Sequence, residues 1–177
     1  MSCFPFMKDI SGAKCLLVGG GGVALRKVQK LHPFGVRVAV CAREVHAELA
    51  ALAEEVYPAY SPEYLQGALF AVAATDDAAL NARVAADCRA RGVPVNCVDA
   101  PALCDFFFPA LITAGEVTVA VSTGGASPAL AAALREYLEG VLPQNLSMIA
   151  ERCKALRGTC SPAEYARRVK AMLTEGV

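Results

Sequence analysis

Short apolar runs and amphipathic stretches alternate through the first hundred residues of the chain. The apolar runs predict β-strands at about residues 14–18, 36–40, 56–59, 68–74 and 93–98. Between them, apolar residues recur at helical spacing, which predicts helices at about 22–32, 44–54 and 77–91. Strands that alternate with helices indicate an α/β fold, with a Rossmann-like parallel sheet covered by helices on both faces.

Helix-breaking and capping residues set the expected ends of these helices. Pro33 and Gly35 are expected to end the first helix, and Gly92 is expected to end the third. Thr75 or Asp76 is expected to cap the start of the third helix, because their side-chain oxygens can accept hydrogen bonds from its first N–H groups.

The pattern changes after residue 100. Two apolar segments, 106–112 and 117–121, flank a four-residue turn and predict a β-hairpin. Ser127 and Pro128 are residue types favoured at the N-cap and the first position of a helix, so we expect a helix to begin there. That helix is expected to end at Gly140, and two more helices are expected at about 144–157 and from Ser161 onward.

This change of pattern divides the chain into three expected parts. They are a Rossmann-like domain (1–112), a dimerisation region (113–145) and a C-terminal helical region (146–177). Leu130, Leu134 and Leu138 recur every four residues and form an apolar stripe on the expected helix of the middle part. Since such a stripe and the edge of the hairpin both need cover, we expect the chain to form a homodimer.

The first predicted strand runs directly into a glycine-rich turn that opens a helix. Residues 18–24 read Val-Gly-Gly-Gly-Gly-Val-Ala and match the dinucleotide-binding fingerprint GxGxxA. Gly19 permits the tight turn, and Gly21 lets the backbone approach a pyrophosphate that the helix N-terminus at Gly22 and Val23 would face. A glycine-rich turn without a ligand is the alternative. Because the motif opens a βαβ unit, the sequence favours a nucleotide site.

The residues after the second strand bear on the identity of the nucleotide. An acidic residue about 20 positions beyond the glycines usually binds the ribose of NAD. The strand instead ends at Cys41, which is followed by Ala42, Arg43 and Glu44. Arg43 could accommodate the 2′-phosphate of NADP, whereas Glu44 could still reach the ribose of NAD. The expected cofactor is therefore NAD, with NADP left open.

Polar residues also follow the fourth and fifth strands, at the edge where open α/β sheets bind ligands. Thr75 and Asp76 follow the fourth strand and are candidate cofactor contacts as well as candidate caps. Asp99 follows the fifth strand, where its carboxylate could accept a proton from a substrate. An aspartate before a turn is also common for structural reasons alone.

Composition excludes several classes of protein. The 177 residues include 17 basic and 17 acidic side chains, and this balance gives no sign of a nucleic-acid partner. No apolar run approaches the ~20 residues of a membrane span. The N-terminus lacks the layout of a signal peptide, so a cytoplasmic location is expected. The eight cysteines contain no Cys-x-x-Cys pair, which favours reduced thiols and no metal site.

These motifs, in this order, resemble the precorrin-2 dehydrogenase and sirohydrochlorin ferrochelatase family, which includes the N-terminal module of siroheme synthase. The resemblance covers residues 4–145 and is most specific in the segments VNCVDAP (95–101) and STGGASP (122–128). It implies oxidation of the tetrapyrrole precorrin-2 to sirohydrochlorin with NAD, as a step of siroheme biosynthesis. In bifunctional members Fe²⁺ is then inserted as a further substrate. The resemblance also implies a homodimer.

The resemblance further implies roles for particular residues. Asp99 matches the family aspartate that acts as general base. The glycine turn through Val23 and the segment Arg43–Glu44 match the cofactor contacts. The residues that the resemblance places on the substrate side are Asn96, Ser122, Thr123 and Ser127. Basic side chains, among them Arg135, could steer the carboxylates of the tetrapyrrole.

Two other functions stay open at this point. A non-catalytic NAD-binding sensor would account for residues 14–98, but it would leave the segments at 95–101 and 122–128 unexplained. A tetrapyrrole carrier without redox activity would need the substrate-side residues but not the general base.

Overall fold

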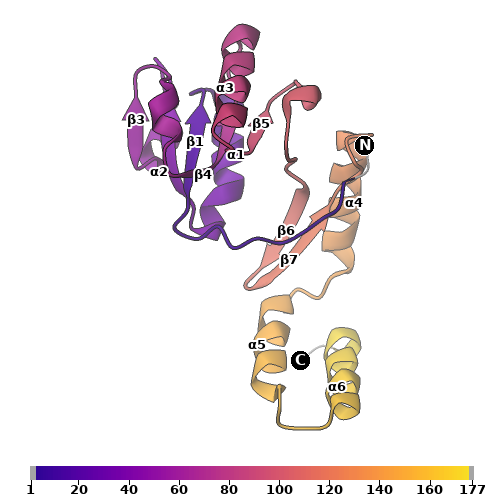
Figure 1. Cartoon of the computed structure of the whole chain (residues 1–177). Coiled ribbons are helices and arrows are strands. Elements are labelled where there is room, and N and C mark those ends of the chain that lie inside the picture. Colours follow the sequence, from indigo (N-terminus) through magenta and orange to yellow (C-terminus); the bar gives the residue numbers. More distant parts are fainter. Residues whose placement is uncertain (1–2, 176–177) are drawn as a thin grey trace. The chain divides into compact units, whose positions relative to one another are not determined.

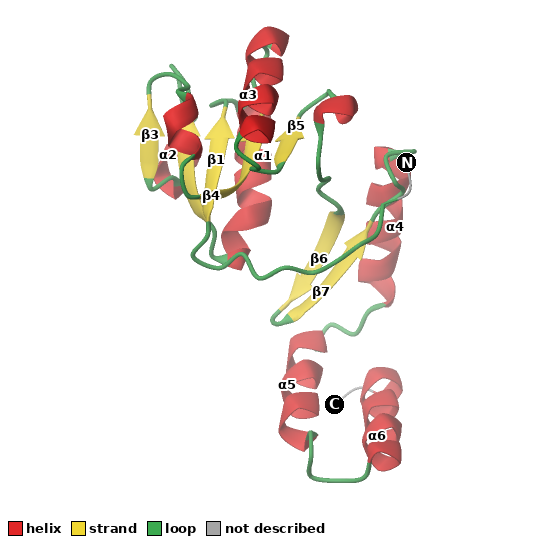
Figure 2. Ribbon diagram, in the orientation of Figure 1, coloured by secondary structure: helices red, strands yellow, loops and turns green. Residues whose placement is uncertain are grey.

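The computed structural model describes residues 3–175, which divide into two compact units. The first unit is Phe6–Phe107, and the second is the chain from Phe108 onward together with the N-terminal residues as far as Pro5. Each unit has a β-sheet of its own (Figures 1 and 2). The boundary that the sequence suggests after residue 112 falls inside a strand of the second unit.

The first unit is built on a parallel sheet of five strands in the order β3-β2-β1-β4-β5. The strands are β1 (Lys14–Val18), β2 (Arg37–Cys41), β3 (Glu55–Tyr57), β4 (Ala68–Ala73) and β5 (Val95–Cys97). Leu17 lies between Val40 of β2 and Val72 of β4, so β1 is central. All five predicted strands are present, and the order reverses direction between β1 and β4, as in a Rossmann fold. The expected fold class is confirmed.

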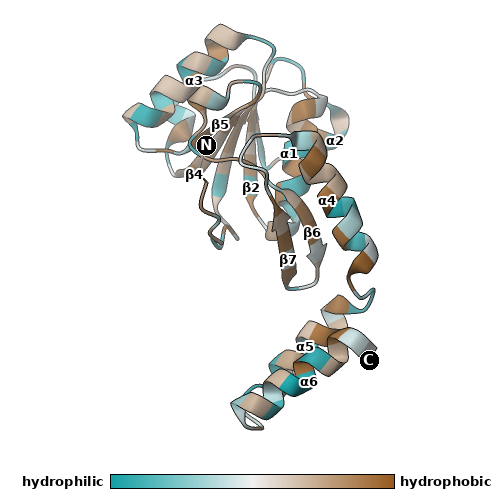
Figure 3. Ribbon diagram, turned by 90° about the vertical axis from the view of Figure 1, so that its right-hand side faces the viewer, coloured by the Kyte–Doolittle hydropathy of each residue, from teal (hydrophilic) through white to brown (hydrophobic). Residues whose placement is uncertain are grey.

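Helices cover both faces of this sheet. They are α1 (Gly22–Leu31), α2 (Ala47–Leu52) and α3 (Ala78–Ala90). Figure 3, in which the strands have hydrophobic colours, shows α3 on one side of the sheet and α1 and α2 on the other. Leu16 and Val18 of β1 join the buried cluster that contains Val84 and Cys88 of α3. Because side chains alternate along a strand, the equally buried Leu17 faces the opposite side.

Two helices of the first unit end as the glycines predict. Helix α1 passes into a 3₁₀ turn, His32–Phe34, and Gly35 then takes a φ of 68°. Helix α3 is followed by Gly92 at a φ of 66°. Both glycines occupy the left-handed conformation that closes a helix and that other residues adopt at a cost.

Two expected helix starts are wrong. The second helix does not begin at residue 44 but at Ala47, after His46, whose ring Nδ1 accepts the N–H of Glu48 at 3.3 Å. The cap of α3 is Asp77, whose carboxylate accepts the N–H groups of Ala79 and Leu80 at 2.9 and 3.0 Å. Thr75 and Asp76 are not caps, because the chain is still in the turn after β4 when it passes them.

The second unit consists of an antiparallel hairpin and three helices. Its elements are β6 (Ala110–Ala114), β7 (Val117–Val121), α4 (Pro128–Val141), α5 (Leu146–Leu156) and α6 (Pro162–Glu175). Ala114 pairs with Val117, so the turn has two residues rather than the expected four. Gly115 begins this turn at a φ of 57°, the conformation that tight hairpin turns require of glycine.

Helix α4 begins and ends at well-defined residues. Ser127 caps it as expected, with its Oγ accepting the N–H of Leu130 at 3.1 Å, and Pro128 is its first residue. The helix does not end at Gly140 but at Val141. Pro143 explains the difference, because the residue before a proline avoids the helical conformation, and Leu142 is extended.

Among the helices described, none is both long enough and apolar enough to cross a membrane.

Candidate functional site

The glycine turn after β1 is pressed against two neighbouring segments. Gly19 has a φ of 127°, and a Cβ added to it would lie 2.3 Å from the carbonyl oxygen of Ala74, after β4. A Cβ on Gly20 would lie only 1.9 Å from the carbonyl oxygen of Glu44, after β2. The carbonyl of Gly20 also accepts the N–H of His46 at 2.9 Å. The carboxyl ends of β1, β2 and β4 therefore meet around this turn.

Gly21 differs from its neighbours because the space next to it is open. Nothing lies within 4 Å of a Cβ built there, and Gly21 is the N-cap of α1, with no side chain capping the helix. The first N–H groups of α1, at Gly22 and Val23, have no partner within the helix. An open space in front of unpaired N–H groups fits a phosphate group, so the residues present fit a dinucleotide.

Arg43 and Glu44 lie on the same edge of the sheet as the glycine turn. Both side chains are exposed, and the backbone that carries them touches Gly20. The N–H of Ala42, just before them, donates to the carbonyl of Tyr57 at 3.0 Å. The backbone at Glu44 is thus next to the turn, and the cofactor contacts expected of Arg43 and Glu44 stay a prediction.

Thr75 is held by a residue that the sequence analysis missed. Its hydroxyl donates to Oδ1 of Asn81 at 2.8 Å, and Nδ2 of Asn81 donates back to the Thr75 carbonyl at 2.9 Å. Asn81 is buried on α3, and a polar residue on the inner face of a predicted helix is the signal that could have identified it. Thr75 thereby fixes the turn against which Gly19 packs, while Asp76 is exposed.

Asp99 has an unusual backbone. Among the described residues other than glycine, it alone has a positive φ, 60°. The residue before it, Val98, donates its N–H to the carbonyl of Ala73 at 2.9 Å, which keeps the start of the loop against β4. The Asp99 side chain is exposed. Residues with strained backbone conformations are concentrated at functional sites, so this conformation makes Asp99 a candidate catalytic residue.

Lys27 of α1 lies within electrostatic range of Asp99. Burial lowers the pKa of Lys27, as does the neighbouring Lys30, while Cys104 and Asp99 act in the opposite direction. A half-buried cation therefore accompanies the Asp99 carboxylate. Lys27 lies in no motif of the sequence that would identify it as a functional residue.

Asn96 lies in the interior of the first unit. It is 5% exposed, and its Nδ2 donates to the carbonyl of Phe106 at 2.9 Å. Its Oδ1 is buried without a hydrogen-bond partner among the residues that the structure describes. The substrate contact expected of Asn96 stays a prediction.

The serine and threonine residues of STGGASP form a self-contained turn in the second unit. Ser122 Oγ accepts the N–H of Gly124 at 3.2 Å, and Thr123 Oγ1 accepts the N–H of Ser127 at 3.1 Å. Together with the cap at Ser127, all three hydroxyl oxygens accept backbone hydrogen bonds. These bonds define the shape of the turn, and its contact with a substrate stays a prediction.

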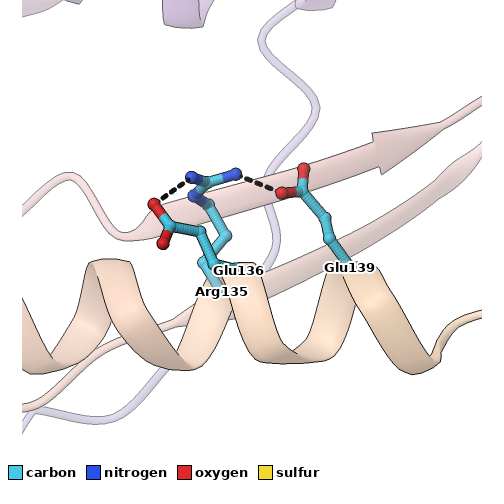
Figure 4. Close-up of polar contacts among 3 residues, drawn as sticks. All are labelled: Arg135, Glu136 and Glu139. Carbon is cyan, nitrogen blue, oxygen red and sulfur yellow. Dashed lines mark hydrogen bonds and ion pairs between the residues drawn. The ribbon is translucent and has the colours of Figure 1, made fainter.

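Acidic neighbours accompany the basic side chains that were expected to steer a substrate. Figure 4 shows Arg135 between Glu136, 3.2 Å away, and Glu139, with which it also pairs. Arg168 pairs with Glu164 in the same way on α6. The positive charge available to an acidic ligand is therefore reduced on both helices.

Within residues 3–175, no group of three or more His, Cys, Asp or Glu side chains is arranged to hold a metal ion.

Comparisons with known proteins agree with this geometry. The chain belongs to the protein family described as "Putative NAD(P)-binding", whose model matches residues 6–110. A second model, described as "Sirohaem biosynthesis protein central", matches residues 115–140. The two matches follow one another along the chain and confirm the family resemblance of its sequence.

Relatives and a solved structure support the same assignment. The siroheme synthase of Ectopseudomonas mendocina is 41% identical over 160 residues, which are 89% of this chain and 35% of that protein. The siroheme synthase of Methylococcus capsulatus is 42% identical over 165 residues, 89% of this chain and 34% of that protein. The chain thus spans about a third of the length of these curated relatives. A solved structure described as "SirC, precorrin-2 dehydrogenase" superposes with a TM-score of 0.73 at 25% identity, covering 96% of this chain and 89% of that one.

Proposed function

We propose that this protein is an NAD-dependent precorrin-2 dehydrogenase, which oxidises precorrin-2 to sirohydrochlorin in siroheme biosynthesis. The observation that carries the proposal is the sheet edge of the first unit. There the open space next to Gly21 and the left-handed Asp99 follow strands of one parallel sheet. The likeness to SirC over nearly the whole chain supports the choice of reaction.

The reaction removes two hydrogens from the tetrapyrrole, one as hydride and one as a proton. NAD⁺, when bound, supplies the hydride acceptor. The Asp99 carboxylate accepts the proton, and its exposure lets that proton pass on to water. Two electrons thus leave with the hydride, and the Asp99 carboxylate is regenerated for the next turnover.

The residues that would hold NAD surround the glycine turn. The N–H groups at Gly22 and Val23 would bind the pyrophosphate, and the open space next to Gly21 leaves room for it. Gly19 permits the close packing of the turn against Ala74 that positions these groups. Glu44 would bind the ribose, with Arg43 available for the 2′-phosphate of NADP. Thr75 and Asp76 complete the proposed cofactor contacts. The proposed substrate contacts are Asn96, Ser122, Thr123 and Ser127.

We also propose that the protein is a homodimer in the cytoplasm. Leu130, Leu134, Tyr137 and Val141 of α4 are exposed apolar side chains, and a second copy of the chain would cover them. All eight cysteines are free, the state that a reducing compartment maintains.

The test is the anaerobic absorbance spectrum of the purified protein with precorrin-2 and NAD⁺, repeated with NADP⁺. We expect the sirohydrochlorin spectrum to develop only with nucleotide, and faster with NAD⁺. Binding of NAD⁺ without spectral change would favour the sensor, and binding of precorrin-2 without turnover would favour the carrier. Adding Fe²⁺ after sirohydrochlorin has formed measures whether the protein also accelerates iron insertion.

A further inference from the structure

The loop that carries Asp99 returns to the strand from which it left. Strand β5 pairs with β4 on one side only, so Val95 and Cys97 direct their N–H and C=O groups to an open edge. Among residues 3–175, no other strand covers this edge. The segment that follows Leu103 does so instead, and mainly through side chains.

Asp105 forms hydrogen bonds with the backbone N–H and C=O groups of Val95, the first residue of the open edge. Its carboxylate accepts the N–H of Val95 at 2.9 Å, and its own N–H donates to the Val95 carbonyl at 2.8 Å. Next to it, the Phe106 carbonyl accepts Nδ2 of Asn96. Asp105 thus acts in place of a partner strand, with one backbone group and one side-chain group.

The thiol of Cys104 forms hydrogen bonds with the backbone N–H and C=O groups of Cys97, the second residue of the open edge. Its Sγ accepts the N–H of Cys97 at 3.2 Å and donates to the Cys97 carbonyl at 3.1 Å. The same Sγ lies 3.5 Å from the carbonyl oxygen of Ala100. Cys97 and Ala100 are the residues on either side of the pair Val98–Asp99. The thiol is therefore hydrogen-bonded to one end of the short segment in which Asp99 has its positive φ, and it lies against the other end.

We infer that Cys104 is a positioning residue for Asp99 in the dehydrogenase reaction. A residue with positive φ persists only where its surroundings hold it. The Cys104 thiol is hydrogen-bonded to Cys97 on one side of Asp99 and lies 3.5 Å from the Ala100 carbonyl oxygen on the other. The thiol does not take part in the proton transfer. It fixes the loop so that the carboxylate stays where the reaction needs it. This inference rests on the proposed function.

The test compares Cys104→Ala with Cys104→Ser and with a control, Cys88→Ala. Serine keeps a group that can donate and accept, whereas alanine keeps neither. Cys88 is fully buried in the core against which Cys104 packs, so its removal tests simple loss of packing. We expect Cys104→Ala to lower kcat about tenfold or more with KM and NAD⁺ affinity unchanged. Cys104→Ser should recover most of this loss, and Cys88→Ala should retain wild-type kcat.

Amide hydrogen exchange measures how strongly the loop is protected from opening, and this measurement does not depend on catalytic turnover. In Cys104→Ala, peptides that cover residues 95–105 should exchange faster than in the wild type, while the rest of the sheet keeps its protection. Faster exchange with an unchanged kcat would overturn the inference, as would equal kcat losses in the alanine and serine variants. Unchanged exchange would show that the thiol does not hold the loop. An inactive wild-type protein would instead refute the proposed function, and the exchange result would still decide whether the hold exists.

Discussion

In the unit Phe6–Phe107, the central strand β1 is enclosed on both faces, whereas helix α4 of the other unit leaves large apolar side chains in solvent. Residues 15–18 of β1 are at most 1% exposed. On α4, Leu134 is 40% and Tyr137 69% exposed. Among the described residues of the second unit, the buried apolar side chains are Ile112, Ala131, Leu146 and Ile149.

The two units therefore differ in how much of their apolar surface they cover themselves. The first unit buries its sheet between its own helices, so its core is complete within the unit. The second unit has few buried side chains, and an exposed apolar helix face is typical of a surface that another chain covers. We therefore expect changes in the first unit to act on folding and on the nucleotide, and changes on α4 to act on assembly.

Gly20→Ala should have the largest effect, because it introduces a Cβ 1.9 Å from the Glu44 carbonyl oxygen. Both atoms belong to the backbone framework of the turn, so the clash cannot be relieved by a rotamer change. We expect a loss of about 3 kcal/mol in the free energy of unfolding, measured by urea denaturation. Gly21→Ala is the matched control, since the same added atom meets nothing within 4 Å. Equal stability of the two variants would contradict the described turn.

Leu134→Asp should dissociate the dimer without destabilising the first unit. A carboxylate in the apolar stripe of α4 cannot be buried without a partner, so the dimer dissociation constant should rise at least about tenfold. Light scattering or sedimentation at micromolar concentration measures this. Ala132→Asp, also exposed on α4 but away from the stripe, is the control. A wild-type protein that is monomeric at that concentration would refute the proposed dimer.

Gly21→Ala should bind NAD⁺ about tenfold more weakly or worse, although its fold is intact. The added methyl group fills the open space in front of the α1 N-terminus, where the proposed pyrophosphate would lie. Titration calorimetry with NAD⁺ measures the affinity, and the melting temperature confirms folding. Wild-type affinity in this variant would place the nucleotide elsewhere.

A further effect concerns alkaline pH and needs no substitution in the wild-type protein. Burial raises the pKa of Cys41 to about 11 and that of Cys88 to about 12, both above the ordinary thiol value. A thiol whose pKa is higher in the folded protein than in the unfolded chain makes its full contribution to stability at pH values below the unfolded-state pKa. That contribution is lost as the pH rises through the folded-state pKa. The free energy of unfolding should therefore fall between about pH 9 and pH 11, by at most about 1.4 kcal/mol per pH unit for each thiol.

A double variant, Cys41→Ala with Cys88→Ala, isolates the thiols. Its stability is lower at neutral pH because two buried groups are removed, but its decline with alkaline pH should be shallower than that of the wild type. Denaturation midpoints measured at several pH values give both slopes. Identical slopes would assign the decline to other groups, such as Tyr57, whose hydrogen bond to Glu55 raises its pKa to about 12.

The sequence predicts those features of the first unit that depend on local pattern. The five strands follow from apolar runs, and Gly19 and Gly21 follow from the spacing of the fingerprint. The need for glycine at position 20 could not be predicted in this way, because it comes from the Glu44 carbonyl, a contact made across the sheet edge. The cap at Asp77 was missed because Thr75 and Asp76, directly before it, are equally suitable residue types, and local sequence does not say which of the three precedes the first turn of the helix.

The loop after β5 was the least predictable part of the site. Asp99 is recognisable from its place at a strand end, but nothing in the local sequence shows that Cys104 and Asp105 would act as a partner strand. Side chains that replace backbone pairing leave no periodic pattern. The exposed stripe on α4 follows in part from the spacing of its leucines: Leu130 and Leu134 are exposed, but Leu138 is half-buried, and Tyr137 and Val141 complete the exposed face.

The most direct test of the central claim is a single turnover of Asp99→Asn with precorrin-2 and NAD⁺ under anaerobic conditions. Asparagine matches aspartate in shape and tolerates the same left-handed backbone, but it cannot accept the proton. We predict unchanged NAD⁺ affinity and a rate of NADH and sirohydrochlorin formation reduced by about 10²–10⁴-fold. A variant that binds NAD⁺ and turns over at the wild-type rate would remove Asp99 from the reaction.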